Sequence, residues 1–245
     1  METLIALESV SKFFGGVEAL LEVDFEVHRG EVVALVGDNA AGKSTLAKIL
    51  AGIYQPDGGC IFMSGQLVTI SDAQAAFALG IASVFQANAL PENLDVVSNI
   101  FLGQELATGG LLDQTLMESR ARDYLAQLGA RIPDLTAPLH NLSAGQRQTV
   151  AIARTLVSQP RLVVLDEPTA SLSVTQTAEV LNHIEGLREL GLGVVLISHN
   201  LADVRAVADR IEVLRHGRNN GSFHAEASFD EVLAAITGAS RAGVR

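Results

Sequence analysis

Short runs of consecutive apolar residues, each ended by a turn signal, recur along the chain. Polar residues do not alternate with apolar ones inside these runs, which is typical of strands in a parallel sheet that is covered on both faces. The pattern predicts buried strands at residues 32–37, 81–85, 162–166 and 193–198.

Stretches whose apolar residues have helical spacing separate these runs. They predict helices at residues 43–51, 175–190 and 201–208. Because strands and helices alternate, the fold class that we expect is α/β, with a wound parallel sheet between layers of helices.

Two segments depart from this alternation. Residues 4–10 and 20–27 resemble strands joined by a turn at Gly15 and Gly16, which predicts an antiparallel β layer at one edge of the domain. From residue 88 to residue 159 helical periodicity dominates, which predicts an inserted α-helical lobe.

We therefore expect one domain over residues 1–245. Residues 1–86 and 160–245 would form the α/β core with its N-terminal antiparallel layer, and residues 87–159 would form the helical subdomain.

Composition narrows the class of protein. Apolar residues make up 48% of the 245 positions and aromatic residues only 4%, with no Trp, so the core must be aliphatic. The formal net charge is −11 and no run is rich in Lys or Arg, which argues against a nucleic-acid partner. An acidic balance still permits a local phosphate site built from backbone N–H groups.

The chain begins without the pattern of a signal peptide, and no stretch reaches the ~18 apolar residues of a spanning helix. We expect a cytosolic protein that reaches a membrane only through a partner. Cys60 is the single cysteine, which excludes an intrachain disulfide, and we expect it to be a buried strand residue.

A glycine-rich segment follows the first predicted buried strand and opens the first predicted helix. This is the phosphate-binding P-loop pattern in the strand–loop–helix context that it requires. Backbone N–H groups of the loop would surround phosphates, Lys43 would reach the outer phosphates, and the Ser44 hydroxyl would ligate Mg²⁺. The segment consists of Gly37, Asp38, Asn39, Ala40, Ala41, Gly42, Lys43, Ser44 and Thr45.

Two adjacent carboxylates, Asp166 and Glu167, end the predicted strand at residues 162–166. Ligands of open α/β sheets bind at the carboxyl ends of the strands. Alone, an Asp-Glu pair is an ordinary polar turn. Beside a P-loop, Asp166 is expected to hold Mg²⁺ and Glu167 to orient or deprotonate an attacking water.

The segment of residues 142–148 allows two interpretations. Ser143 and Gln146 have the spacing of a capping box, which begins helices in unrelated proteins. The segment indicates a functional motif, and not only a helix cap, because it lies between a P-loop and a carboxylate-bearing strand.

With these motifs together, the sequence resembles the ATPases of ABC transporters over essentially its whole length. The resemblance also includes Gln86 after the strand at residues 81–85, and His199 in the sequence Leu-Ile-Ser-His-Asn. It implies a RecA-like P-loop NTPase core with an antiparallel β edge subdomain and an inserted helical subdomain. It also implies ATP and Mg²⁺ as ligands.

The resemblance assigns further roles. Gln86 would contact Mg²⁺ and the attacking water, and His199 would hydrogen-bond the γ-phosphate. The signature segment would contact ATP bound to a second copy of the chain in a head-to-tail dimer. That segment comprises Ser143, Ala144, Gly145 and Gln146.

Phe14 aligns with the aromatic residue that stacks on adenine in the family. The alternative is an ordinary core residue of the edge sheet, because many proteins bury such a Phe. Both interpretations stay open from the sequence.

Three positions depart from the commonest family pattern. Ala40 replaces a frequent glycine, which carries an energetic penalty only if the backbone needs a positive φ there. Ala144 replaces the usual second glycine of the signature. Ser173 stands where many members have Asp, and with Gln176 it predicts a capping box for the following helix.

Local features resemble the ATPases of simple-sugar importers. The resemblance implies a peripheral protein at the cytoplasmic face of the membrane, docked through its helical subdomain on a permease and served indirectly by a substrate-binding protein. Because most members of that branch are tandem fusions and this chain carries one ATPase domain, we expect a homodimer. The features lie at residues 37–39, 99–103, 197–200, 208–211, 215–218 and 236–239.

Other functions share the same catalytic motifs. An ATPase for another cargo, such as an amino acid, or for export would differ only in the local sugar-branch features. A non-transport regulatory ATPase would be expected to carry basic patches or a coiled-coil insertion, and the sequence shows neither. Apolar residues at the start of the helical lobe would either line the permease groove or pack the lobe: Leu90, Leu94, Val96 and Phe101.

Overall fold

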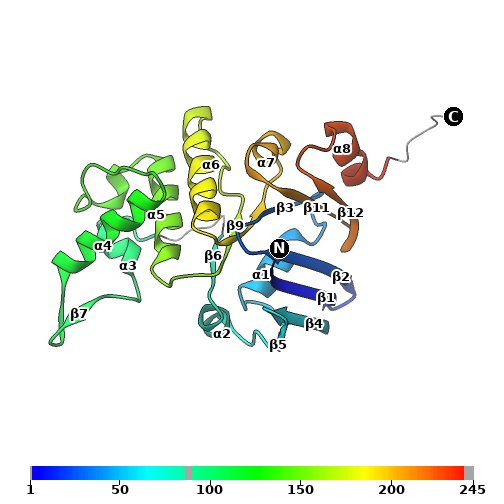
Figure 1. Cartoon of the computed structure of the whole chain (residues 1–245), viewed down its shortest axis with the longest axis horizontal. Helices are drawn as coiled ribbons and strands as arrows, with labels where there is room; N and C mark the ends of the chain where they lie inside the picture. The colour runs from blue at the N-terminus through cyan, green and yellow to red at the C-terminus, as the bar shows by residue number, and fades with distance from the viewer. Residues whose placement is uncertain (1, 86–89, 240–245) are drawn as a thin grey trace.

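The computed structural model describes residues 2–85 and 90–239. Its centre is a six-stranded sheet with the strand order β12-β11-β3-β10-β9-β6 (Figure 1). Five of these strands pair in parallel, and β12 runs antiparallel to β11 at one edge. The strands are β3 (Val32–Val36), β6 (Ile81–Val84), β9 (Leu162–Asp166), β10 (Gly193–Ile197), β11 (Arg210–Arg215) and β12 (Arg218–His224).

The central strands are buried on both faces. Every residue of β3, β9 and β10 is buried, as the unbroken apolar runs predict. Alternate residues of these strands belong to two separate hydrophobic clusters, because side chains of a strand point to opposite faces. The α/β class and the four predicted strands are confirmed, with bounds shifted by at most one residue.

Helices cover one face of the central sheet. They are α6 (Val174–Glu189), α7 (Leu201–Val207) and α8 (Phe229–Thr237), whose apolar residues join the same cluster as Ala34 of β3 (Figure 1). The other face packs against α1 (Lys43–Leu50), α2 (Ala73–Ala78) and the antiparallel sheet. The domain therefore has helices on one side and a helix-and-sheet layer on the other.

The antiparallel layer predicted at the start of the chain is present. β1 (Thr3–Phe14) pairs with β2 (Val17–His28), and β4 (Gly58–Met63) and β5 (Gln66–Val68) extend the sheet beyond β1. β4 begins with two glycines and β5 has only three residues, so neither shows a clear strand pattern in the sequence. Cys60 lies on β4 but is exposed, so its predicted burial is wrong.

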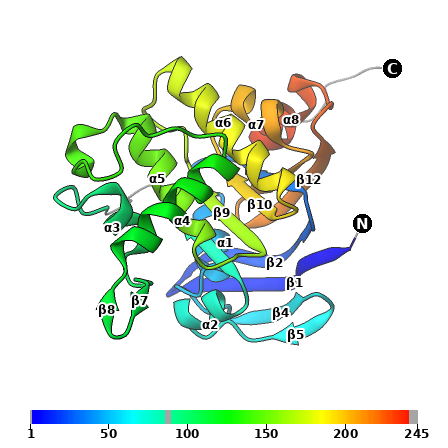
Figure 2. The same cartoon turned by 60° about the vertical axis from the view of Figure 1, so that its left-hand side comes forward.

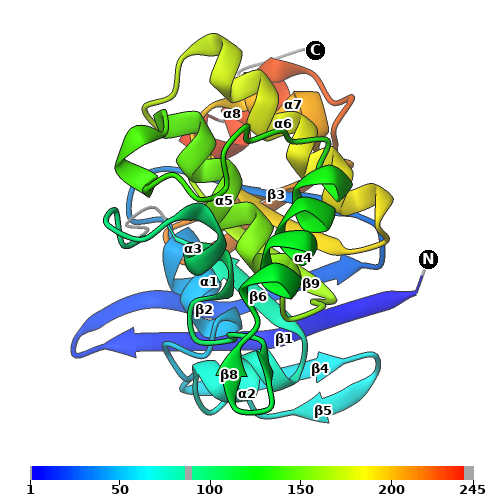
Figure 3. The same cartoon turned by 90° about the vertical axis from the view of Figure 1, so that its left-hand side faces the viewer.

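Helices dominate the segment after residue 90, as predicted (Figures 2 and 3). They are α3 (Val96–Phe101), α4 (Gln114–Gln127) and α5 (Ala144–Leu156), with a small hairpin of β7 (Ala107–Thr108) and β8 (Leu111–Leu112) before α4. The division at residues 86/87 and 159/160 stays a prediction. Over the described residues, no helix is both long and apolar enough to cross a bilayer.

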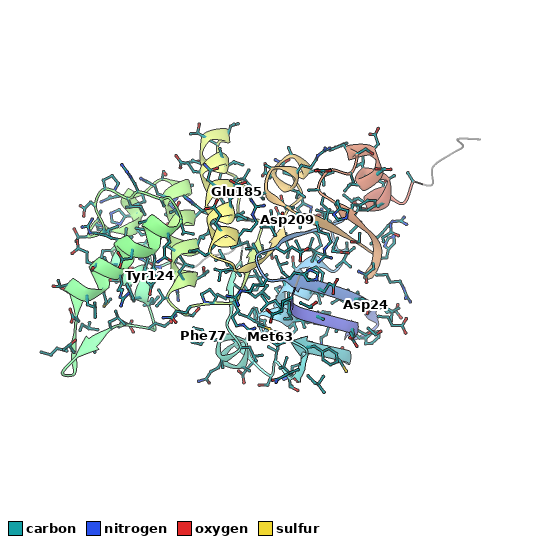
Figure 4. All side chains as sticks on the ribbon, viewed as in Figure 1. Asp24, Met63, Phe77, Tyr124, Glu185 and Asp209 are labelled. Atoms are coloured by element: carbon teal, nitrogen blue, oxygen red, sulfur yellow. The ribbon has the colours of Figure 1, made fainter. Side chains whose placement is uncertain are left out.

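The apolar residues at the start of this segment do not share one environment. Val96 and Phe101 are buried, and the Phe101 ring contacts that of Tyr124, which Figure 4 labels on α4. Leu90 packs against the same cluster, whereas Leu94 lines an open hollow of about 280 Å³. Most of this set packs the lobe, and Leu94 remains accessible.

Gly52 follows the end of α1 and packs closely against Asp72, the residue that caps α2. It has φ +71°, and a Cβ there would lie 2.1 Å from the Asp72 carbonyl oxygen. Asp72 in turn caps α2 by accepting a hydrogen bond from the Ala75 N–H at 2.8 Å. Gly65 in the β4–β5 turn has a similar φ of +75°, but no atom lies within 4 Å of the position of its Cβ.

We expect Gly52→Ala to lower the free energy of unfolding by about 2 kcal/mol more than Gly65→Ala does. Both substitutions place a side chain at positive φ, which costs about 1 kcal/mol, and only Gly52→Ala adds a backbone clash, worth about 1–3 kcal/mol. Urea denaturation of the two variants measures the difference. Equal losses would show that the contact with Asp72 does not constrain the fold.

Candidate functional site

The site lies where three adjacent parallel strands end. β10 lies between β3 and β9, and its Ile197 pairs with Leu35 of β3 and with Asp166 of β9. Parallel strands in register end at the same edge of a sheet, which is where ligands of open α/β sheets bind. This pairing brings the P-loop, the two carboxylates and the loop that carries His199 to one edge.

Two glycines of the P-loop are required by close backbone contacts. Gly37 follows β3 with φ +151°, and a Cβ there would lie 2.1 Å from the Leu214 carbonyl oxygen on β11. Gly42 has φ +106°, and its Cβ would lie 2.6 Å from Leu20 Cδ2 and 2.7 Å from the Ala19 carbonyl oxygen on β2. The loop is therefore held between the central sheet and the antiparallel layer.

Lys43 is the first residue of α1, and its side chain returns over the loop. The residue is buried, and its Nζ donates hydrogen bonds of 2.8 Å to the carbonyl oxygens of Gly37 and Asp38. Burial lowers the pKa of Lys43 from its ordinary value. Three carboxylates oppose this lowering of the pKa, those of Glu167, Asp166 and Asp38.

The N-terminus of α1 faces the same loop. Its N-cap is Gly42, which has no side chain to accept a hydrogen bond from the first turn. The first N–H groups of a helix have no partner within the helix and carry a partial positive charge. Together with the Lys43 ammonium, they form a cradle suited to phosphate groups.

The two carboxylates that end β9 lie opposite Lys43. Asp166 is buried, and burial raises its pKa above the ordinary value, against the hydrogen bond from Ser44 and the charge of Lys48. Burial likewise raises the pKa of Glu167, and the charge of His199 is the largest opposing effect. Both carboxyl groups are therefore easier to protonate than exposed ones.

Glu167 and His199 lie close together. His199 Nε2 is 3.1 Å from Glu167 Oε1, within ion-pair distance. The alignment is not that of a hydrogen bond, so this buried oxygen has no hydrogen-bond partner among the described residues. Glu167 also has φ +54°, an uncommon conformation for a non-glycine residue and one that recurs at functional sites.

A single cavity of about 300 Å³ joins most of the predicted residues. The P-loop from Asn39 onwards, the carboxylates and His199 line it, and Gly37 and Asp38 line a neighbouring hollow that shares Asn39 and His199. The full lining of the cavity is Phe14, Val17, Glu18, Ala19, Asn39, Ala40, Ala41, Gly42, Lys43, Ser44, Thr45, Asp166, Glu167, Ile197 and His199.

Phe14 is not a core residue. Its side chain is 41% exposed, at the end of β1 and on the wall of this cavity. Its ring packs edge-on against Tyr54, with centroids 5.0 Å apart, and Lys12 Nζ lies 5.5 Å from the ring centroid. The contact with Tyr54 was not predicted, because a lone tyrosine after a helix gives no signal in the sequence.

The segment from Ser143 to Gln146 does not line this cavity. Ser143 caps α5, with its Oγ accepting from the Gln146 N–H at 3.2 Å and Gln146 Oε1 accepting from the Ser143 N–H at 2.9 Å. The predicted capping box is therefore confirmed, and Ala144 beside it is exposed. Ser173 and Gln176 form the same motif at the start of α6. Gln86, predicted as a site residue, lies outside the described residues.

The donor set of the cavity suits a nucleotide with Mg²⁺. The Ser44 hydroxyl and the Asp166 carboxylate supply the oxygen ligands that Mg²⁺ prefers. Among the described residues, at this cavity as elsewhere, no group of three or more His, Cys, Asp or Glu side chains could hold a metal by itself. Such a sparse set fits Mg²⁺, which keeps several waters and binds through one or two carboxylates together with substrate phosphates.

Comparison with known proteins identifies the family. A family profile described as "ABC transporter" matches residues 20–170. The chain belongs to the ABC transporter family. The match includes the P-loop, the capped segment at Ser143 and both carboxylates of this ABC protein.

Two relatives illustrate the closeness of the match. The chain is 42% identical to the ribose import ATP-binding protein RbsA 1 of Rubrobacter xylanophilus, over 98% of this chain and 48% of that protein. It is 42% identical to the xylose/arabinose import ATP-binding protein XylG of Sulfolobus acidocaldarius, over 89% of this chain and 87% of that protein. The chain thus spans about half the length of the RbsA relatives that it matches.

Solved structures share the fold. A nucleotide-free ATP-binding cassette from an ABC transporter superposes with a TM-score of 0.85 at 24% identity, over 95% of each chain. The cbiO1 protein of Clostridium perfringens, part of the ABC transporter complex cbiONQ, gives 0.79 at 29% identity, over 96% of this chain and 92% of that one. The expected ABC ATPase fold is therefore confirmed.

Of the departures from the family pattern, Ala40 is the one whose backbone conformation is strained for a residue other than glycine. It is exposed and has φ +63°, a conformation that glycine adopts without strain. Ala41 beside it is buried, and its φ is not positive. In this ABC protein, substitution by glycine would therefore relieve backbone strain at Ala40 but not at Ala41.

We expect Ala40→Gly to raise the free energy of unfolding by about 0.5–1 kcal/mol, because relief of the left-handed strain exceeds the greater entropy of the unfolded chain. Ala41→Gly is the matched control and should lower the free energy of unfolding by about 1 kcal/mol, since it only adds entropy and removes a buried methyl. Urea denaturation of both variants measures these changes. Destabilisation by Ala40→Gly would show that the loop carries no strain at this residue.

Proposed function

We propose that this chain is the ATP-binding and ATP-hydrolysing subunit of an ABC importer for a simple sugar. The observation that carries the ATPase proposal is the convergence of Lys43, the two carboxylates and His199 around one cavity at the edge of the sheet. The sugar proposal is supported by the relatives that are named ribose and xylose/arabinose import proteins.

Most of the predicted site residues that line the cavity have a role in this proposal. The loop N–H groups, Lys43 and Thr45 bind the phosphates of ATP, and Phe14 stacks on the adenine with its exposed face. Ser44, Asp166 and Gln86 hold Mg²⁺, which neutralises charge on the phosphates when it is bound. These side chains hold the substrate in position, which is the main task of a phosphoryl-transfer site.

Glu167 and His199 act on the attacking water and the outer phosphate. The unpartnered Glu167 Oε1 accepts a hydrogen bond, and then the proton, from that water, and the raised pKa of this carboxyl favours proton uptake. His199 donates a hydrogen bond to the γ-phosphate from its place 3.1 Å from Glu167. The γ-phosphoryl group passes directly to water as its bond to the β–γ bridging oxygen breaks and ADP leaves, with no covalent enzyme intermediate.

A second copy of the chain completes each site. Ser143, Ala144, Gly145 and Gln146 do not line the cavity of their own chain, yet they cap a helix whose N–H groups suit an anion. In a head-to-tail dimer they contact the ATP that the partner copy binds. ATP binding then closes the dimer, and hydrolysis opens it.

We expect Lys43→Ala and Ser143→Arg each to abolish ATP hydrolysis when purified alone. A mixture of the two should regain activity, because a mixed dimer contains one intact site built from the wild-type P-loop of one copy and the wild-type Ser143 of the other. Phosphate release before and after mixing measures this. A mixture that stays inactive, with both variants folded and able to dimerise, would contradict a site shared between copies.

The helical subdomain is where we propose that membrane permease subunits dock, on the cytoplasmic side of the membrane. The accessible hollow beside α3 and α4 supports this, since Leu94, Val97 and Leu112 line it together with polar residues. A substrate-binding protein would act on the permease, without contact to this chain. No nucleic-acid partner is proposed.

We expect cells whose chain carries Glu167→Gln to lose uptake of one or two sugars from a panel of labelled pentoses and hexoses. The variant should bind MgATP without turning it over, so the transport cycle stops with a closed dimer. Glu189→Gln is the control, since this exposed residue lies at the end of α6 away from the cavity. Unchanged uptake of every sugar, with an active wild-type ATPase, would redirect the proposal to another cargo or to export.

A further inference from the structure

The neighbouring helices α5 and α6 begin near residues that are proposed to contact two different ATP molecules. α5 begins at the capping box of Ser143, the residue proposed to reach ATP on the partner copy. α6 follows β9 and the carboxylates that serve the chain's own ATP, and it begins at the capping box of Ser173. The two helices pack side by side (Figures 1 and 2), so contacts between them join the two sites.

The first contact lies within the first turn of each helix. Gly145 is buried on α5, and a Cβ there would lie 2.8 Å from Cγ and 3.0 Å from Cβ of Gln176 on α6. This glycine is required by the close approach of the two helices and not by its backbone conformation, because its φ is not positive. The two capping boxes are thereby held against one another.

The second contact is a buried hydrogen bond that lies about one turn further along α5 and about two turns further along α6. Thr149 Oγ1 of α5 lies 3.1 Å from His183 Nε2 of α6, and it also lies 3.0 Å from the Gly145 carbonyl oxygen. His183 Nδ1 lies 2.8 Å from the Leu128 carbonyl oxygen at the end of α4. Both residues are only 5% exposed. His183 lies on α6 two residues before Glu185, which Figure 4 labels.

The direction of these hydrogen bonds follows from the acceptors. A carbonyl oxygen can only accept, so Nδ1 of His183 carries a proton and donates it to Leu128. Burial lowers the pKa of His183, which favours the neutral ring. Nε2 of the neutral ring then carries no proton and only accepts, so the one proton of the Thr149 hydroxyl is shared between Nε2 and the Gly145 carbonyl oxygen. The imidazole thereby connects α4, α5 and α6 through buried hydrogen bonds.

We propose that Thr149 and His183 are positioning residues for ATP hydrolysis: their hydrogen bond fixes the start of α5 against α6 and so sets where Ser143 meets the nucleotide of the partner copy. The inference rests on the proposed shared site. Neither side chain lines the ATP cavity, so both act through the helix that carries Ser143.

A purely structural role makes a different prediction. If the pair only stabilised the fold, variants would lower the melting temperature, and folded protein would hydrolyse ATP at the normal rate. A positioning role alters kcat in folded protein, because a misplaced group loses its effect on the transition state while the P-loop still binds nucleotide.

The test compares Thr149→Val, which keeps the volume but lacks the hydroxyl, with Thr149→Ser, which keeps the hydroxyl but lacks a buried methyl. For the full chain and both variants, kcat, melting temperature and the dissociation constant for ADP are measured. We expect Thr149→Val to lower kcat about tenfold with unchanged ADP affinity. Thr149→Ser should melt at a lower temperature yet retain the wild-type kcat.

A wild-type kcat in Thr149→Val would overturn the inference and leave the proposed function standing. A kcat that follows the melting temperature in both variants would also overturn it, because stability and not the hydroxyl would then matter. A wild-type chain without ATPase activity would overturn the proposed function, and this inference with it.

Discussion

The site depends on the parallel pairing of β10 with β3 on one side and β9 on the other. Because Ile197 is in register with both Leu35 and Asp166, the three strands end together. A shift of one residue in either pairing would turn the apolar side chains of a strand toward the wrong face. The buried aliphatic residues on both faces therefore fix the register, and the register brings the chemically active loops to one edge of the sheet.

The charges at this edge are buried together and compensate one another. Burial raises the pKa of Asp166 and of Glu167 and lowers that of Lys43, and each effect is opposed by the charges opposite. Backbone strain accompanies this arrangement, since Ala40 and Glu167 both have positive φ. At Glu167 a positive φ coincides with a pKa that burial raises, and this combination is typical of a site whose geometry serves binding or chemistry more than stability.

The packing of α5 against α6 connects residues of the two proposed ATP sites. β9 leads through Glu167 and a short turn into α6, and α6 contacts α5 at Gly145 and again at Thr149. The contacts therefore form a continuous path from the carboxylates to the helix that begins at Ser143. In a dimer with shared sites, this path would run from one nucleotide to the other through a single chain.

The sequence alone determined the α/β class, the four buried strands, the P-loop, the carboxylate pair and the helix caps at Ser143 and Ser173, because each depends on neighbouring residues. It did not show β4, β5 or the exposure of Cys60, since β4 is held by its pairing with β1 and β5 by its pairing with β4. Only the tertiary structure decided that Phe14 faces the cavity, that Ala40 is strained, and that Gly145, Thr149 and His183 join two helices. These features depend on contacts between residues distant in the chain, and local patterns do not encode them.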